Sequence, residues 1–346
     1  MAIVFLDGFE NYGPIGTTGA ALTAAMQARW NLGLAYEGGY NYASIVSGRN
    51  GGKALSIDKT ESVLGWTHFG IAFPQSDYVV FGFAFSYYPA DLDTTGGWNR
   101  SHFYFGNAGS SLLLVSCGAD GWGRIYRGST QIAGHPVLTG GWHYYEYKVY
   151  FHDTAGTIDV QIDGNLVLSA TGLDTRASSS SCNSIFIAPT DNYLFDDMYI
   201  ATGSGQGFLG PITIEAIRPT ADITTGWTST GGNHYGEVDD TIFDANTYVS
   251  SSTINAADKW TCSNLATVTD DIVAIQPSAI GKLATAGLRA LTVTCDSGAN
   301  SDSATLQMAH TAELEAKVIS ETDPNTATAW TNTAIEAATY GVKVGD

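Results

Sequence analysis

Charged residues are scarce in this chain, and basic residues are the scarcest. Asp, Glu, Lys and Arg make up 14% of the 346 residues, whereas soluble domains average about 25%. Only 15 basic side chains stand against 34 acidic ones, which gives a net charge of −19 at pH 7. Nucleic-acid-binding proteins need a basic surface, so this balance excludes nucleic acid as a partner. The acidic excess indicates solubility or a surface that repels other acidic surfaces.

Long apolar runs and metal-binding spacings are also missing. No apolar run approaches the ~20 residues that a membrane-spanning helix needs, so we expect no membrane insertion. The histidines form no HxH or HxxxH pair and the cysteines no CxxC pair, so zinc has no support in the sequence. The four isolated cysteines favour buried free thiols, with one or two disulfides as the alternative: Cys117, Cys182, Cys262 and Cys295.

Two catalytic signatures are absent as well. The chain has no G-x-S-x-G sequence, which presents the nucleophilic serine of α/β-hydrolases. The lone glycine-rich stretch "GSGQG" (203–207) leads into no predicted helix, so it does not predict a phosphate loop.

Aromatic residues, glycine and short alternating runs are abundant and predict an all-β fold. "YVVFGFAFSYYP" (78–89) is almost continuously apolar, as a buried sandwich strand is. "WHYYEYKVYFH" (142–152) alternates instead. Short strands between regular turns are typical of a β-sandwich. In the second run, one face carries Tyr145, Tyr147, Val149 and Phe151, and the other carries Glu146, Lys148 and Tyr150.

A change in composition near residue 205 predicts two domains. "TGSGQGFLGP" (202–211) combines glycine, serine and proline, which is typical of a linker. We therefore expect a β-sandwich over 1–203, a linker over 204–211 and a smaller β-rich, sandwich-like domain over 212–346. Short helices are expected within 18–33 and at about 331–338.

Four segments of the first domain carry a resemblance to a known family. They are the opening "LDGFE", the run at 78–89, the pair "WHYYEYKVYF…GTIDVQIDGNLV" and the closing "YLFDDMYI". Together they resemble the concanavalin A-like, or laminin G-like, jelly-roll family. The resemblance covers about residues 1–203 and implies that the opening segment pairs with a strand near the end of the domain.

The second half carries a different resemblance. "FLGPITIEAIRPTAD", "VDD…DANTYVSSS" and "WTNTAIEAATYGVKV" are similar to C-terminal regions of tailed-bacteriophage structural proteins. The combination implies a non-enzymatic virion protein (a decoration, fibre or tail-associated protein) that is assembled in the host cytoplasm and bound to capsid or tail proteins. The alternatives are a carbohydrate-binding module that recognises a host surface glycan and, more remotely, a glycoside hydrolase.

The hydrolase alternative lacks its paired acids. Glucanases that resemble the sandwich family use Glu-x-Asp-x-x-Glu on one strand, so that alternate acids share a cleft. "EVDDTIF" (237–243) has Ile242 in place of the last Glu, and "ETDPNT" (321–326) has Thr326 there. This absence predicts that the chain is not an enzyme.

Tryptophans in glycine-rich loops are the candidate glycan-binding residues. Trp98 with Arg100 ("TTGGWNR") and Trp122 with Arg124 ("GADGWGR") pair an aromatic ring with a cation. A ring of this kind could stack on a sugar. In the alternative interpretation, each tryptophan caps the core or packs on a neighbouring subunit.

The jelly-roll resemblance also implies a candidate site for a structural calcium ion, although the sequence itself predicts no cofactor. Asp7, Glu10 and Asp197 are its candidate ligands, and they supply only part of the six to eight oxygens that calcium takes. In the alternative, one carboxylate of the pair Asp196 and Asp197 faces inward with hydrogen bonds and the other is solvated, because neighbouring strand residues face opposite ways.

The C-terminal segment is the candidate for assembly. Trp330, Ile335, Tyr340 and Val342 stand among small residues and could dock on another subunit or on the particle. We expect a homo-oligomer, and the phage resemblance favours a trimer. In the alternative, the segment packs back on its own domain as a last strand.

Overall fold

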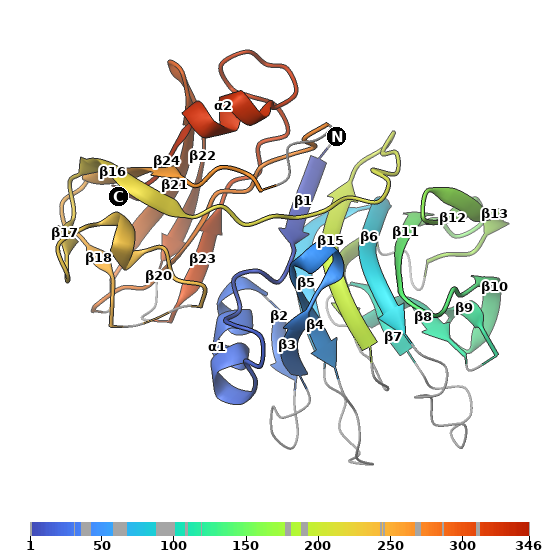
Figure 1. The fold of residues 1–346 in the computed structure, drawn as a ribbon. Helices are drawn as coiled ribbons and strands as arrows, with labels where there is room; N and C mark the ends of the chain where they lie inside the picture. Colours follow the sequence, from blue (N-terminus) through green and yellow to red (C-terminus); the bar gives the residue numbers. More distant parts are fainter. Residues whose placement is uncertain are drawn as a thin grey trace. The chain divides into compact units, whose positions relative to one another are not determined.

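A computed structural model divides the chain into two compact units (Figure 1). Unit 1 comprises Met1–Glu10 and Pro14–Ile214, and unit 2 comprises Asn11–Gly13 and Glu215–Asp346. For residues 32–35, 68, 87, 101 and 102 the description is limited to the backbone. It describes residues 2–345 with the exception of 31, 36–42, 58–67, 88–100, 108–109, 119, 177–180, 188–192, 243, 245, 267–270, 286 and 309–311.

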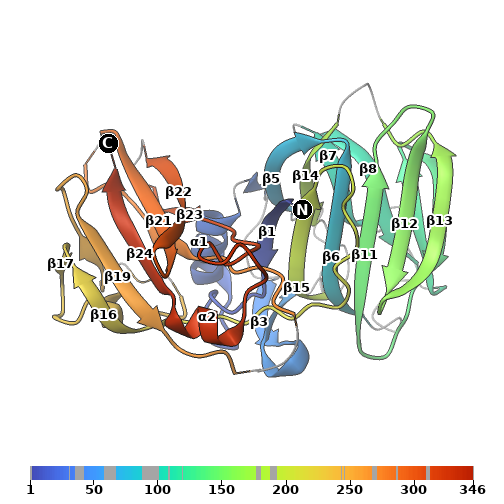
Figure 2. The same ribbon diagram turned by 90° about the horizontal axis from the view of Figure 1, so that it is seen from above.

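Unit 1 is the expected jelly-roll sandwich of two antiparallel sheets, here called sheets A and B. Sheet A has the order β13-β12-β11-β6-β15-β4-β3, with β1 also paired to β15. The strands β15, β6, β11, β12 and β13 follow side by side in Figure 2. The strands of sheet A are β1 (Ala2–Asp7), β3 (Ala43–Ser47), β4 (Lys53–Ile57), β6 (Tyr78–Tyr87), β11 (Trp142–Tyr150), β12 (Gly156–Ile162), β13 (Asn165–Leu173) and β15 (Tyr193–Thr202).

Sheet B has the order β10-β9-β8-β7-β14-β5-β2. The helix of unit 1 is α1 (Gly19–Arg29), which lies within the segment where the sequence predicts one. The strands of sheet B are β2 (Leu32–Ala35), β5 (His68–Ser76), β7 (Ser101–Asn107), β8 (Ser110–Cys117), β9 (Trp122–Arg127), β10 (Thr130–Pro136) and β14 (Cys182–Ile187).

Aromatic rings from both sheets fill the core of unit 1. Phe83 on β6 stacks on Tyr147 on β11, with ring planes 4° apart and centroids 6.2 Å apart. Phe103 on β7 meets Phe83 edge to face at 5.4 Å, which joins sheet B to sheet A. The face predicted for Tyr145, Tyr147, Val149 and Phe151 is therefore confirmed as the core face, since all four are buried and the three rings contact phenylalanines of the core.

The closing strand β15 changes partner halfway along its length. Tyr193–Phe195 pair with β4, and Met198–Thr202 pair with β1. A bulge separates the two halves, and Asp197 within it has a positive φ of 47°. Because the bulge breaks the alternation of faces, Asp196 and Asp197 are both 2% exposed. The expectation that one of this pair is solvated is therefore wrong.

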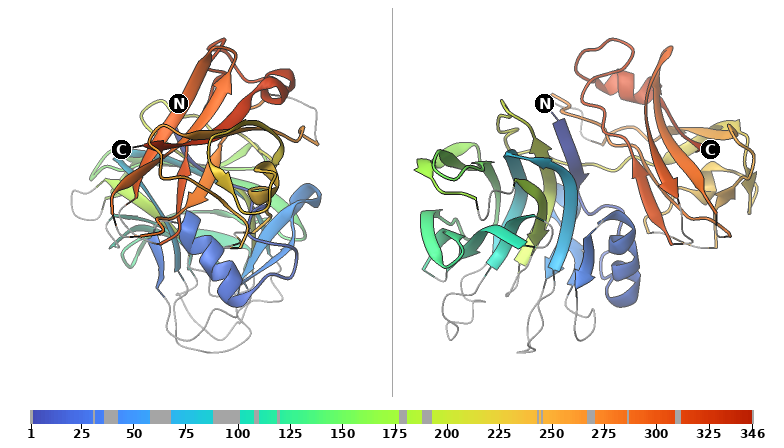
Figure 3. Two further views of the ribbon diagram at one scale, coloured as in Figure 1. Left: turned by 90° about the vertical axis from the view of Figure 1, so that its left-hand side faces the viewer. Right: turned by 180° about the vertical axis from the view of Figure 1, so that it is seen from behind.

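Unit 2 is also β-rich and is built on a five-stranded antiparallel sheet, sheet C, with the order β16-β19-β24-β21-β22. Two smaller sheets pair β17 with β18 and β20 with β23. The helix α2 packs against β19 and β21 (Figure 3). The elements of unit 2 are β16 (Pro219–Thr225), β17 (Thr228–Ser229), β18 (Val249–Ser250), β19 (Ala257–Cys262), β20 (Ser278–Gly281), β21 (Arg289–Ser297), β22 (Asn300–Met308), β23 (Leu314–Lys317), α2 (Asn332–Ala337) and β24 (Thr339–Gly345).

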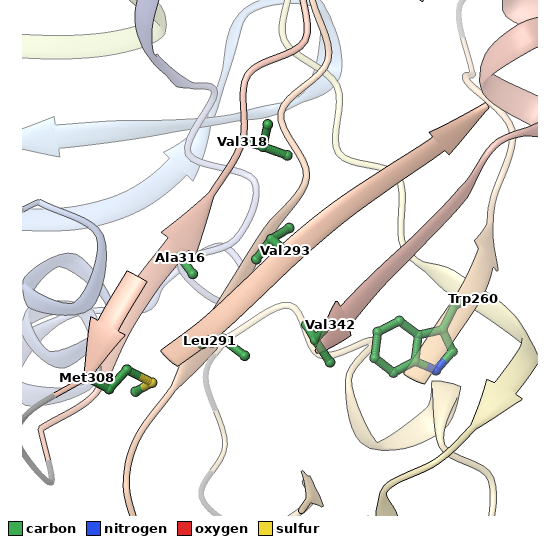
Figure 4. Close-up of a cluster of buried hydrophobic side chains, with 7 residues drawn as sticks. All are labelled: Trp260, Leu291, Val293, Met308, Ala316, Val318 and Val342. Atoms are coloured by element: carbon green, nitrogen blue, oxygen red, sulfur yellow. The ribbon is translucent and has the colours of Figure 1, made fainter. Parts of the chain in front are cut away.

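The core of unit 2 lies on one face of sheet C. Alternate residues of β21 and β24 point into it, together with the ring of Trp260 from β19. Figure 4 shows one of its clusters, in which the buried side chains are Trp260, Leu291, Val293, Met308, Ala316, Val318 and Val342.

The four residues proposed for assembly belong to this core. The exposed fraction is 3% for Trp330 and Ile335, 8% for Tyr340 and 7% for Val342. The Trp330 indole donates a hydrogen bond to the Ser320 carbonyl at 3.1 Å. The expectation that they dock on a partner is therefore corrected: the segment packs on its own unit, with β24 as its last strand. These four residues therefore no longer serve as the contact of the predicted homo-oligomer. The homo-oligomer itself stays a prediction.

All four cysteines are free thiols, as the sequence favours. Burial raises the pKa of the Cys182 thiol to about 12. No helix in the described part of the chain has the length and hydropathy needed to cross a bilayer.

Candidate functional site

The outer face of sheet B carries the most exposed tryptophan of the described chain. Along β9 the side chains alternate: Ile125 is buried in the core, so Trp122, Arg124 and Tyr126 face outward. Trp122 is 43% exposed. The strand thus presents the exposed Trp122 ring and the half-buried Arg124 guanidinium group, both predicted from the sequence, whereas Tyr126 on the same face is 6% exposed.

Two glycines make room for these side chains. A Cβ atom added to Gly134 on β10 would lie 2.6 Å from Trp122 Nε1 and 3.4 Å from the Gln131 amide nitrogen. A Cβ atom added to Gly118 would lie 2.6 Å from Arg124 Nη1. The Trp122 ring therefore lies close over the backbone of β10.

Asp120 fixes the guanidinium group of Arg124 beside the tryptophan. Its carboxylate accepts hydrogen bonds from both Arg124 Nη atoms and, at 3.2 Å, from the Trp122 backbone N–H. Arg124 Nη1 also donates to the Trp122 carbonyl at 3.1 Å. The hydrogen bond with Arg124 lowers the pKa of Asp120 and raises that of Arg124. The pair is therefore ionised at neutral pH and carries no net charge.

A row of mostly aromatic side chains crosses the same face from strand to strand; Tyr126 and Phe186 in it are buried, and Tyr104 is half-buried. Tyr126 pairs with Leu114 on β8, which pairs with Tyr104 on β7, which pairs with Phe186 on β14. The Tyr104 and Phe186 rings stack with centroids 4.7 Å apart and planes 14° apart. Gln131 on β10 ends the row opposite Tyr126 and is exposed. Tyr104 and Gln131 were not among the predicted site residues, although the alternation in "SHFYFGN" (101–107) indicates an outward Tyr104.

The first predicted tryptophan pair, Trp98 and Arg100, lies outside the described residues. Only the pair Trp122 and Arg124 can therefore be placed.

The predicted calcium ligands are each engaged by protein groups. Asp7 accepts hydrogen bonds from the Phe9 N–H at 2.9 Å and from the Trp30 indole at 3.1 Å. Glu10 accepts from the Lys53 N–H at 2.7 Å. Asp197 accepts from Arg49 Nη1 at 3.2 Å and from the Ile214 N–H at 2.7 Å. Among the described residues no three His, Cys, Asp or Glu side chains are grouped to hold a metal.

Opposite sheet B, the outer face of sheet A is covered by residues 203–214, here called the strap. This segment contains the predicted linker and belongs to unit 1. One oxygen of Glu146 accepts hydrogen bonds from the Leu209 and Gly210 N–H groups at 2.9 and 3.0 Å and from the Tyr199 hydroxyl at 2.5 Å. The Phe208 ring lies 5.0 Å from Lys148 Nζ. The Glu146 side chain is wholly buried, and burial raises its pKa.

No family model matches the chain, and a comparison with curated proteins found no match. Solved structures do match, at low identity. An endo-β-1,4-glucuronan lyase from Trichoderma reesei is 15% identical over 46% of this chain and 87% of its own, with a TM-score of 0.34. An alginate lyase is 15% identical over 58% and 96%, with a TM-score of 0.36. The catalytic domain of a family 131 glycoside hydrolase from Coprinopsis cinerea is 14% identical over 61% and 98%, with a TM-score of 0.37.

These matches correct two expectations. The chain was expected to be a virion structural protein and not an enzyme, but the three solved structures named above are two polysaccharide lyases and a glycoside hydrolase. None of the three is a virion protein, so the fold lends no support to the virion function or to the absence of catalysis. At this similarity the matches show the fold alone. The predicted virion location and virion partners stay predictions.

Proposed function

We propose that unit 1 binds a polysaccharide on the outer face of sheet B, with Trp122 as the platform for one sugar ring. The observation that carries the proposal is the exposed Trp122 ring over Gly134, next to a guanidinium group that Asp120 holds in place. Ligand sites typically combine aromatic side chains with a few placed polar groups, and Trp122 with Arg124 is such a combination.

The chemistry of this face suits a sugar. One side of a pyranose ring presents C–H groups, which pack on an aromatic ring. Its hydroxyls need donors and acceptors at the edge of that ring, and the Arg124 guanidinium and Gln131 amide supply them. Since Asp120 balances the charge of Arg124, recognition here needs no charge on the sugar.

The length of the face suits a chain of sugars. The row from Gln131 to Phe186 crosses five hydrogen-bonded strands. Neighbouring strands lie about 4.8 Å apart, so the row extends over roughly 19 Å, which exceeds one sugar ring. Because Tyr126 and Phe186 are buried, the second aromatic ring accessible along it is the half-buried Tyr104, whose ring centroid lies 4.7 Å from that of Phe186.

The test is a binding screen of intact protein against soluble neutral and acidic polysaccharides by affinity electrophoresis. Replacing Trp122 by Ala should weaken binding by about 30-fold or more, because aromatic anchors carry about 2 kcal/mol or more of a binding free energy and about 1.4 kcal/mol is tenfold. The control Leu166→Ala removes a side chain that is 58% exposed on β13 of sheet A and should leave binding unchanged.

The same samples are assayed for cleavage. New reducing ends report hydrolysis, and ultraviolet absorbance of unsaturated sugars reports elimination. Unchanged binding in Trp122→Ala, or no binding to any polysaccharide of the screen, would overturn the proposal.

A further inference from the structure

A second polar site lies in unit 2, on the face of sheet C opposite its core. It is a pocket of about 290 Å³ above the strands β19, β24, β21 and β22. Ligand pockets usually measure about 300–1,000 Å³, so this one suits a ligand no larger than a single sugar. The polar side chains that line it are Lys259, Thr292, Thr294, Asp296, Ser301, Ser303 and Lys343.

One edge of the pocket is a side chain that crosses a whole strand. Lys259 on β19 reaches over β24 to Asp296 on β21, where Nζ and the carboxylate are 2.7 Å apart. The crossing takes place at Gly341, since a Cβ atom added there would lie 2.8 Å from the Lys259 Cγ. Glycine at this position therefore keeps the lysine in place across β24.

The second lysine of the pocket carries an unbalanced charge. Lys343 lies beside Thr292 on β21 and Ala257 on β19, and within the described part of unit 2 it has no ion pair or hydrogen bond. The other lysines of unit 2, Lys282 and Lys317, are each paired with a glutamate. In a chain of net charge −19, two lysines against one aspartate make this pocket locally positive.

We infer that this pocket binds a sugar that carries a carboxylate. The Lys343 ammonium group would pair with the carboxylate, and the hydroxyls of Thr292, Ser301 and Ser303 would exchange hydrogen bonds with those of the sugar. Charge selects the ligand here, whereas on sheet B the aromatic ring does. The inference is independent of the proposed function, because its residues all belong to unit 2.

Calorimetric titration of the intact protein with D-glucuronate tests this site. The neutral methyl glucoside and inorganic sulfate serve as comparison ligands. We expect glucuronate to bind more tightly than either, and Lys343→Gln to weaken its binding about tenfold or more, since it removes a charge-assisted hydrogen bond. The control Lys282→Gln removes an exposed lysine charge elsewhere in unit 2 and should have no effect.

Three results would overturn the inference: no glucuronate binding, equal affinity for the neutral glycoside or for sulfate, or binding that survives Lys343→Gln. Trp122→Ala should leave glucuronate binding intact, which separates a failure here from a failure on sheet B. Thermal denaturation of Lys343→Gln confirms that the variant is folded.

Discussion

Glu146 ties the strap to sheet A, and truncating it should destabilise unit 1. The side chain is wholly buried, and one of its oxygens accepts three hydrogen bonds, from the Leu209 and Gly210 N–H groups and from the Tyr199 hydroxyl. Glu146→Ala removes the acceptor of all three. The Gly210 N–H and the Tyr199 hydroxyl then lose their acceptor, whereas the Leu209 N–H keeps the Tyr199 oxygen as a second acceptor at 3.3 Å.

The size of the effect follows from these contacts. Each buried polar group left without a partner costs about 1–3 kcal/mol. Two such groups, the Gly210 N–H and the Tyr199 hydroxyl, set the upper limit. The loss is partly offset because the other Glu146 oxygen is buried without a partner in the described structure and no longer has to be desolvated. We expect a net loss of about 3 kcal/mol, which lowers Tm by about 6–12 °C in a unit of this size.

Thermal denaturation followed by near-ultraviolet circular dichroism measures this loss, and limited proteolysis shows whether residues 203–214 become the first site of cleavage. Glu146→Gln keeps an acceptor oxygen and should lose less than half as much stability. Asp153→Ala, which removes an exposed acid from a turn of the same unit, is the control and should be neutral. A Glu146→Ala variant within about 0.5 kcal/mol of wild type, the range of ordinary surface substitutions, would refute the assignment of the strap's anchor.

Two further predictions concern buried groups. Burial and the neighbouring Asp197 raise the pKa of Asp196 from 3.8 to about 8. Between these pH values the folded state therefore binds more protons than the unfolded state, so the free energy of unfolding should fall as pH rises from about 4 to about 8. Asp196→Asn should flatten this pH dependence in thermal melts, and an unchanged pH dependence would count against the raised pKa. Trp330→Ala should lower the free energy of unfolding by about 3–5 kcal/mol, because it leaves a cavity in the unit 2 core. It should not change the sedimentation coefficient of the folded protein. An altered oligomeric state at unchanged stability would instead support a role of Trp330 in assembly.

The sequence predicts the sandwich well, because the sandwich depends on local alternation. The rings of Tyr145 and Tyr147 are buried as the period of two requires. Alternation does not reveal what covers the other face. The sequence pattern therefore gives no indication that Glu146 is buried, because its burial depends on the strap. The prediction that one of Asp196 and Asp197 is solvated fails for a related reason. The bulge between them depends on β15 changing its partner strand from β4 to β1, and no local sequence pattern encodes that change.

Among the residues of the candidate sites, only those close together in the sequence could be predicted from it. Trp122 and Arg124 share a strand face because they are two residues apart. Tyr104 and Gln131 join them through strand order, which the sequence does not specify. Trp330 was misassigned because a tryptophan among small residues is compatible both with a core and with an interface, and only the packing of α2 and β24 decides between them.

The central claim, that sheet B binds a sugar chain through Trp122, is tested most directly by the indole N–H resonances of the eight tryptophans. The Trp122 resonance is assigned by comparison with Trp122→Phe, and the spectrum is then followed during titration with an oligosaccharide of a polysaccharide that binds. The account predicts a saturable shift of the Trp122 indole resonance, whereas the resonance of the buried Trp330 stays in place. A titration that saturates while the Trp122 resonance does not move would contradict it.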